Sequence, residues 1–237
     1  MRPYIRSMQS FLRQIREDSM LFIICAVPLL VALVFRFGVP MLENLLCEVF
    51  GEASVLSDYY LLFDLFLAVI TPYMFVFVSA MVMLTEMDDH IAIYLAVTPI
   101  RKKGYIISRL GFPAAISMVV TAVLMSTCAL SQWSIINIML VSMSASLISI
   151  PIAMLIVAFS HNRVEGMALA KMAGLVLLGL PAPFFLPMRY QYFLGWLPSF
   201  WTAKAFVDMK VWPLIPLVAV SLLWIWALYR RFQRKII

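Results

Sequence analysis

Charged, apolar and helix-breaking residues follow one another in the segment from residue 86 to residue 105. They are an acidic pair, an apolar pair, a Thr-Pro break and a basic triplet: Glu86 and Asp88, Tyr94 and Leu95, Thr98 and Pro99, and Arg101–Lys103. Carboxylates suit a helix N-terminus, where the helix dipole is positive, and the residue before a proline is pushed out of the α region. We therefore predict a short surface helix over residues 86–97. Such a helix is suited to bind a soluble partner, and the alternative is a solvated connector.

The sequence lacks the residue patterns that carry catalysis or nucleotide binding. It contains no phosphate-binding loop ending in Gly-Lys-Ser/Thr, no Gly-x-Ser-x-Gly and no His-Glu-x-x-His. The two histidines, His90 and His161, lie at the edges of apolar stretches, and the three cysteines have no metal-binding spacing. We therefore predict no catalytic residue, no metal site and no cofactor bound by this chain.

Charged residues inside apolar stretches are a second kind of candidate. Asp64 lies in the apolar stretch 59–84, and Lys171 lies in the stretch 166–188. A charge at the bilayer centre costs at least about 2.5–3.5 kcal/mol. Asp64 is the better functional candidate, because a carboxylate facing a central cavity in the substrate pathway would attract a cationic drug. The alternative is that both side chains snorkel to an interface.

These candidates belong to a chain that is too apolar for a soluble fold. Of its 237 residues, 64% are hydrophobic and 13% are charged, and the mean hydropathy is +0.99. Soluble domains carry about 45–50% apolar and about 25% charged residues. Six stretches are long and apolar enough to cross a bilayer as helices: residues 20–37, 59–84, 111–130, 135–159, 166–188 and 211–229. We predict an all-α polytopic membrane protein with six transmembrane helices, forming a single domain over residues 1–237.

Lysine and arginine are concentrated in alternate connections. Four arginines precede the first span, a basic triplet precedes the third and four basic residues follow the last, whereas residues 38–58 hold four carboxylates and no Lys or Arg. The positive-inside rule then places both termini in the cytoplasm. Residues 189–210 disagree with the rule, because they are predicted outside and hold three basic residues. We interpret the net charge of +6 as topology and attraction to anionic membrane lipid, with no nucleic acid as partner.

Two further segments have the character of a membrane interface. Residues 3–17 place apolar residues on one helical stripe and arginines on another, which predicts an amphipathic interfacial helix on the inner leaflet. Its apolar stripe consists of Ile5, Met8, Leu12 and Ile15. Residues 189–210 are rich in aromatic residues and interrupted by a Gly and a Pro. They predict short interfacial or re-entrant helices at the outer surface, or alternatively an aromatic belt beside the last span.

The segment from residue 86 resembles the coupling segment of the permease subunits of type-2 ABC exporters. In that family an acidic pair is followed by a glycine, a Leu-rich helix, Ser/Thr-Pro-Val/Ile and basic residues. The matching positions are Glu86, Asp88, Leu95, Thr98, Pro99 and Ile100. The usual glycine is replaced at residues 90–91. The helix 3–17 resembles the connecting helix of the family, and residues 194–202 resemble its outer Pro-aromatic segment. Small bacterial drug-export permeases of the fluoroquinolone type and bacteriocin-immunity permeases share this size and layout.

The resemblance implies a membrane-spanning permease subunit of an ATP-driven exporter in the bacterial plasma membrane, moving a drug, peptide or lipid-like substrate out of the cell. It implies a separate nucleotide-binding ATPase subunit that carries ATP and Mg²⁺, and a second permease chain, identical or different. The residues implied to couple to the ATPase are Glu86, Asp88, Tyr94, Leu95, Thr98 and Pro99. Two other classes stay open: a substrate-binding membrane subunit of an importer, and an intramembrane enzyme, which needs ionisable residues at matched depth in facing spans.

Overall fold

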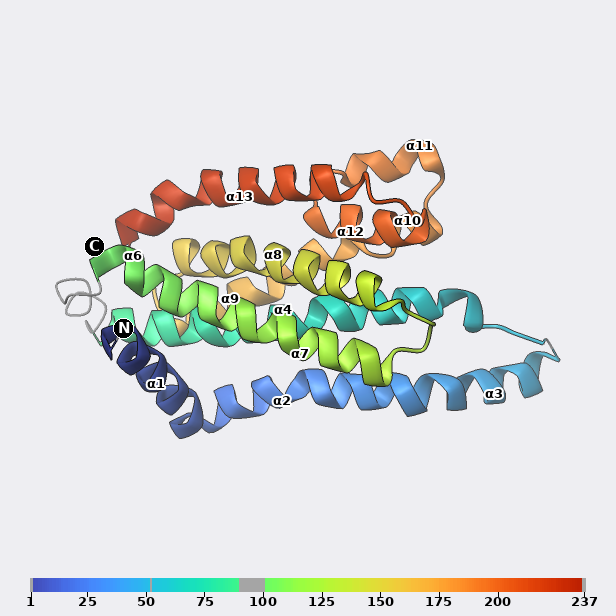
Figure 1. Ribbon diagram of the computed structural model, residues 1–237, viewed down its shortest axis with the longest axis horizontal. Helices are drawn as coiled ribbons and strands as arrows, with labels where there is room; N and C mark the ends of the chain where they lie inside the picture. The colour runs from blue at the N-terminus through green and yellow to red at the C-terminus, as the bar shows by residue number, and fades with distance from the viewer. Residues whose placement is uncertain (1, 52, 90–100, 236–237) are drawn as a thin grey trace.

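The computed structural model describes residues 2–51, 53–89 and 101–235, and all regular elements within these ranges are helical (Figure 1). Five helical segments are long and apolar enough to cross a membrane: Ser19–Phe50, Ser57–Asp88, Gly104–Cys128, Ile135–Phe159 and Leu214–Lys235. These segments run side by side in one bundle, and both chain ends lie at the same end of it (Figure 1). The polytopic all-α prediction is confirmed.

The predicted N-terminal amphipathic helix is present as α1 (Arg2–Glu17), which runs obliquely to the helix that follows it (Figure 1). Its inward face differs from the predicted stripe, because Phe11 is buried against the bundle while Leu12 is half exposed. Asp18 then turns the chain by accepting hydrogen bonds from the first backbone N–H groups of α2 (Ser19–Leu33).

The first span is longer than predicted. From α2 the helix passes through the π-helical turn η1 (Val34–Gly38) into α3 (Val39–Phe50), so residues 38–50 are helical where a loop was expected. At about 1.5 Å per residue, the 32 residues of Ser19–Phe50 exceed a hydrocarbon core of about 30 Å. Glu43 accepts hydrogen bonds from the backbone N–H groups of Val55 and Leu56, at 2.9 and 2.6 Å, and thereby holds the returning chain against α3.

Two helices form the centre of the bundle. They are α4 (Tyr60–Asp88) and α8 (Ile135–Phe159), which pack against each other and bury most of their residues. Around them lie α2, α7 (Phe112–Cys128) and α13 (Leu214–Lys235). The third predicted span begins earlier than residue 111, because α6 (Arg101–Ile106) and the π-helical turn η3 (Ile107–Gly111) lead directly into α7.

The fifth predicted span, 166–188, is wrong as a single continuous helix. It is divided into α9 (Arg163–Ala173), the 3₁₀ turn η4 (Gly174–Gly179) and α10 (Ala182–Phe185). Pro181 and Pro183 interrupt the helical hydrogen bonds. A Cβ at Gly179 would lie 2.6 Å from the backbone nitrogen of Phe200. Glycine therefore permits the backbone of η4 to touch the next segment, at the expense of helix continuity.

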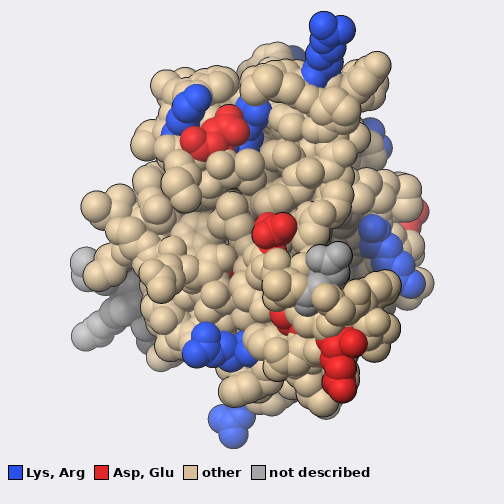
Figure 2. Space-filling model, turned by 90° about the vertical axis from the view of Figure 1, so that its right-hand side faces the viewer, with Lys and Arg blue, Asp and Glu red and all other residues tan. Residues whose placement is uncertain are grey.

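The segment 189–210 forms short helices, as predicted. They are α11 (Met188–Gln191), the 3₁₀ turn η5 (Tyr192–Leu194) and α12 (Pro198–Val207), which packs against α13, η4 and α8. Lys204 is buried here, donates to Gln191 Oε1 at 3.1 Å and lies 3.5 Å from Asp208 Oδ2. One of the three basic residues that opposed the positive-inside rule is therefore compensated internally. Figure 2 shows this end of the bundle, where charged side chains are scattered over a mainly uncharged surface.

Candidate coupling site

The acidic pair Glu86 and Asp88 belongs to the last turn of α4. The helix runs to Asp88, and the backbone N–H of Asp89 still donates to the carbonyl of Thr85 at 2.9 Å. The prediction that this pair begins a new helix over 86–97 is therefore wrong at its start. A helix C-terminus carries partial negative charge, so carboxylates there need donors from elsewhere.

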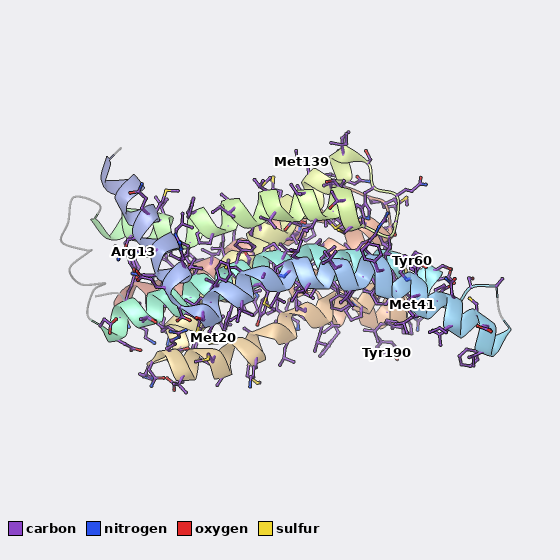
Figure 3. The ribbon with its side chains drawn as sticks, turned by 90° about the horizontal axis from the view of Figure 1, so that it is seen from below. Arg13, Met20, Met41, Tyr60, Met139 and Tyr190 are labelled. Carbon is purple, nitrogen blue, oxygen red and sulfur yellow. The ribbon has the colours of Figure 1, made fainter. Side chains whose placement is uncertain are left out.

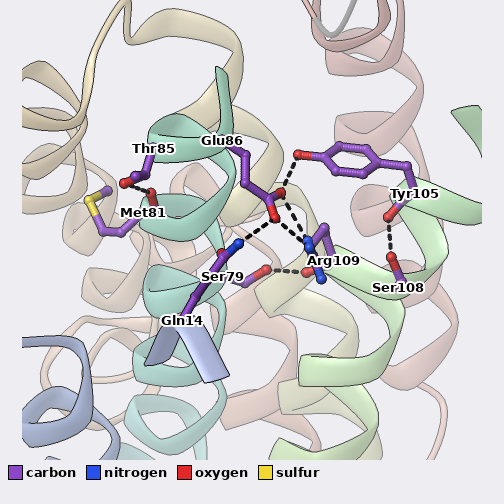
Figure 4. Close-up of polar contacts among 8 residues, drawn as sticks. All are labelled: Gln14, Ser79, Met81, Thr85, Glu86, Tyr105, Ser108 and Arg109. Atoms are coloured by element: carbon purple, nitrogen blue, oxygen red, sulfur yellow. Dashed lines mark hydrogen bonds and ion pairs between the residues drawn. The ribbon is translucent and has the colours of Figure 1, made fainter. Parts of the chain in front are cut away.

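Three side chains, from α1 and from the α6–η3 segment, donate hydrogen bonds to Glu86 of α4 (Figure 4). Arg109 of η3 donates from Nε to Glu86 Oε2 at 3.0 Å and from Nη2 to Oε1. Tyr105 of α6 donates its hydroxyl to Oε2 at 2.9 Å, and Gln14 of α1 donates from Nε2 to Oε1 at 3.1 Å. Each carboxylate oxygen accepts two hydrogen bonds, so Glu86 joins α1, α4 and the α6–η3 segment.

The guanidinium of Arg109 is enclosed as well as paired. Its carbon lies 5.2 Å from the ring centroid of Phe11, within the range of a cation–π contact. Phe11 in turn meets Phe112 edge to face, with ring centroids 6.4 Å apart. The hydroxyl of Ser79 on α4 donates to the carbonyl of Arg109 (Figure 4). π-Helical turns such as η3 occur frequently at functional sites, and here the turn aims Arg109 at the end of α4.

The ion pair between Glu86 and Arg109 is buried, which makes the loss of either partner costly in folding free energy. Glu86 is 1% exposed and Arg109 is 0% exposed. Removing one partner of a buried pair typically costs about 3–5 kcal/mol, because the other charge is left without compensation. The sequence had placed Glu86 at a solvated membrane exit, where a lost ion pair costs about 0–1 kcal/mol. The structure corrects this, because Glu86 is almost fully buried and its hydrogen bonds join α1, α4 and the α6–η3 segment.

A cleft of about 540 Å³ opens beside the cluster, between the start of α2, the end of α4 and the start of α9. Gln14 and Glu86 form part of its wall, so the cluster is continuous with the cleft. The charged residues in its lining are four carboxylates and one guanidinium: Glu17, Asp18, Glu86 and Asp89, with Arg163. Three of these carboxylates are in ion pairs, Glu17 with Arg13, Glu86 with Arg109 and Asp18 with Arg163. The cleft lies at the end of the bundle that carries both termini.

Arg163 ties together the elements around this cleft. Its guanidinium pairs with Asp18 at 2.5 Å, and its backbone N–H donates to Asp88 Oδ2 at 3.3 Å. Partial burial opposes ionisation of Asp18, but hydrogen bonds from Arg163 and from the N–H groups of Leu21 and Met20 hold its pKa below the ordinary value. The turn between α1 and α2 is thus anchored to α9 by a charged contact.

The remaining predicted coupling residues are Asp88, which is exposed at the end of α4, and four residues of the following segment. Tyr94, Leu95, Thr98 and Pro99 lie outside the described residues. The chain leaves the described structure after Asp89 and returns at Arg101, and both points are at the end of the bundle that holds the cleft (Figure 1). Among the described residues, no group of three or more His, Cys, Asp or Glu side chains could hold a metal ion.

Asp64 does not face a cavity as predicted. It is buried near the start of α4, and its oxygens accept hydrogen bonds from the backbone N–H groups of Leu130 and Ser131, both at 2.8 Å, and from Trp133 Nε1 at 2.9 Å. A pocket of about 300 Å³ at this end is lined by Trp133 and not by Asp64. Asp64 therefore fixes the turn between α7 and α8. Lys171, the other in-span charge, is exposed on α9.

Three residues of the cluster were missed in the sequence, namely Gln14, Tyr105 and Arg109. Tyr105 and Arg109 are four positions apart, so they occupy one face of a continuous helix. That signal was hidden because the predicted third span began at residue 111, which left both residues in a loop. Gln14 carried no signal, since the partner of a polar residue on a surface helix depends on how that helix packs.

The whole cluster lies within a region shared with known proteins. A family model described as fluoroquinolones export permease protein Rv2686c-like matches residues 11–229. The chain belongs to this family. Two relatives from Mycobacterium tuberculosis are named fluoroquinolones export permease protein MT2760 (strain CDC 1551 / Oshkosh) and Rv2686c (strain ATCC 25618 / H37Rv). Each is 28% identical to this chain, and the match covers 88% of both proteins. No solved structure matches the chain.

Membership confirms the resemblance to exporter permeases that the segment 86–100 indicated. The relatives are named as permeases, which are transport proteins and not enzymes. The shared region includes the second part of α1, from residue 11 onward, and all of α4 and η3, the elements that Glu86 joins. All four residues of the buried cluster therefore lie within the region that matches the family.

Proposed function

We propose that this chain is the membrane-spanning permease subunit of an ATP-driven drug exporter. Family membership supports the transport class, and the buried Glu86–Arg109 cluster supports a route by which force enters the bundle. Because the relatives are named for fluoroquinolones, a planar amphipathic drug of that class is the cargo that we propose. The fluoroquinolone name, together with the absence of a catalytic pattern, favours export over the importer and intramembrane-enzyme alternatives.

The cluster indicates how ATP hydrolysis on a partner would move this chain. We infer that a separate ATPase, which carries ATP and Mg²⁺, binds the segment that follows α4, with Asp88, Tyr94 and Leu95 as contacts and Thr98-Pro99 ending the contact helix. Glu86 then acts as a positioning residue. Since it joins α4 to α1 and to η3, a push on the end of α4 moves these elements together.

The remaining parts of the assembly follow from this proposal. A second permease chain, identical or different, faces this one, and two ATPases bind the pair. Both termini and the cleft beside Glu86 lie at the cytoplasmic side of a bacterial plasma membrane. The basic residues that flank both termini, which lie at a common end of the bundle (Figure 1), support this orientation through the positive-inside rule.

Binding and ATP hydrolysis test the proposal together. The purified chain alone is expected to hydrolyse no ATP, and addition of its ATPase is expected to give hydrolysis that a fluoroquinolone stimulates. Asp88→Asn, and Tyr94→Asp combined with Leu95→Asp, should each weaken capture of the ATPase. Glu48→Gln is the matched control, because Glu48 is an exposed carboxylate on α3, at the opposite end of the bundle. Turnover by the isolated chain, or equal capture by all variants, would contradict the proposal.

A further inference from the structure

A second cleft, of about 310 Å³, lies beside the junction of α1 and α2. Figure 3 shows that α1 leaves α2 at an angle there. Its walls come from α1, α2, α4 and α7, and they include Phe11, Phe22, Phe75 and Ile116. Arg16 is the one charged residue in its lining. The cleft is thus an apolar groove with a single cation in its lining.

Arg16 differs from its neighbour on the same helix. Arg13 pairs with Glu17 at 2.8 Å. Arg16 is exposed, and among the side chains that the structure describes none forms an ion pair with it. Its guanidinium therefore has five N–H donors available for an anion, beside a groove that excludes polar groups.

A membrane phospholipid has an apolar chain that suits the groove and a phosphate that suits the guanidinium of Arg16. A groove in the hydrocarbon region is filled by acyl chains, but hydrocarbon packing alone gives no preference for one lipid over another, since lipid tails are as apolar as the residues that line it. Preference must come from the headgroup. A guanidinium forms strong charge-assisted hydrogen bonds to phosphate, and one basic residue near an anionic membrane surface favours anionic lipid by about fivefold.

We propose that this groove binds an acyl chain of an anionic phospholipid whose headgroup phosphate pairs with Arg16. The site shares no lining residue with the cleft beside Glu86 and does not depend on the cargo. It touches the coupling cluster through Phe11, which lines the groove on one side and covers the guanidinium of Arg109 on the other. An occupied groove therefore supports the position of α1 against Glu86.

Two adjacent positions on α2 allow a matched fluorescence experiment. Phe22 and Ile23 are 60% and 61% exposed, but only Phe22 lines the groove. The native cysteines Cys25, Cys47 and Cys128 are replaced by alanine, and bimane is attached after either Phe22→Cys or Ile23→Cys. Each protein is reconstituted into phosphatidylcholine vesicles that contain brominated phosphatidylglycerol or brominated phosphatidylcholine, and quenching is measured against the mole fraction of brominated lipid.

The site predicts about fivefold stronger apparent binding of the brominated phosphatidylglycerol at Phe22→Cys, with little preference at Ile23→Cys. Arg16→Gln should abolish the preference, and Arg13→Gln should preserve it, because Arg13 does not line the groove. The same preference at both labels, or an equal loss with Arg13→Gln, would mean diffuse surface charge and would overturn the proposal. Absence of quenching at Phe22→Cys would mean that another molecule fills the groove, and would overturn it too.

Discussion

Removing the charges of Glu86 and Arg109 separately and together tests whether they act as one unit. Either Glu86→Gln or Arg109→Met leaves a buried charge without its partner, which typically costs about 3–5 kcal/mol. For a protein of this length, about 2–4 °C of melting temperature accompanies each kcal/mol, so each single variant should melt at least about 6 °C lower. In the double variant both charges are gone, and replacement of a whole buried pair is often nearly neutral. The double variant should therefore be more stable than either single variant.

The assay for this cycle is thermal unfolding of purified protein in one lipid or detergent mixture, with ATP-driven transport measured on the same preparations. The matched control is the exposed pair Arg13 and Glu17, whose side chains are 79% and 62% exposed. Arg13→Met and Glu17→Gln should leave the melting temperature unchanged, alone or combined. In the double variant at Glu86 and Arg109, transport should recover less than stability, because the charged side-chain link from α4 to η3 is absent. Additive single effects, with an interaction energy below about 0.5 kcal/mol, would refute the argument.

Four further predictions concern the rest of the chain. Asp64→Asn should destabilise by about 1–3 kcal/mol in thermal unfolding, since it replaces one of the two oxygens that accept from partly buried N–H groups at the α7–α8 turn. The transport per folded molecule should stay unchanged, and a transport defect at full stability would restore Asp64 to the substrate pathway. The lowered pKa of Asp18 means that its ion pair stabilises the fold above about pH 4 and is lost as the pH falls through the folded pKa. Asp18→Asn, which can still cap α2, should therefore lower the melting temperature near neutral pH and have no effect at the lowest pH; a pH-independent difference would contradict this. Met209 adopts a left-handed conformation with φ of 49° after α12, so Met209→Gly should raise the free energy of unfolding by about 0.5–1 kcal/mol, and destabilisation would count against the assigned backbone. A reporter that is active only outside the cytoplasm should be silent when fused after Ile237 and active when inserted near Glu48, and the reverse pattern would overturn the orientation.

Hydropathy located most of the helices of the bundle, because whether a stretch can span a membrane depends more on its apolar composition than on the order of its residues. The fourth predicted span, 135–159, coincides with α8, and α4 differs from its prediction by a few residues. The failures have local causes. The stretch 166–188 is apolar enough to span, but Gly179 and the prolines 181 and 183 break the helix while another segment packs against it. Hydropathy averages over such breaks.

The site was less accessible to prediction because it depends on which helix faces lie together. The sequence drew attention to Glu86, but it could not show that α4 continues past it or that Arg109 approaches from another helix. Asp64 illustrates the same limit. An in-span carboxylate is expensive unless it is satisfied, and the sequence does not reveal that three N–H donors of the α7–α8 turn satisfy it.

ATP-dependent drug accumulation in inside-out membrane vesicles tests the central claim most directly. Vesicles that contain this chain and its ATPase should accumulate a fluoroquinolone when ATP is supplied. Accumulation should be absent without the chain, absent with an ATPase that binds but does not hydrolyse ATP, and reduced by Glu86→Gln after correction for the amount of folded protein. If the drug accumulates equally without ATP or without this chain, the chain is not the permease of an ATP-driven drug exporter.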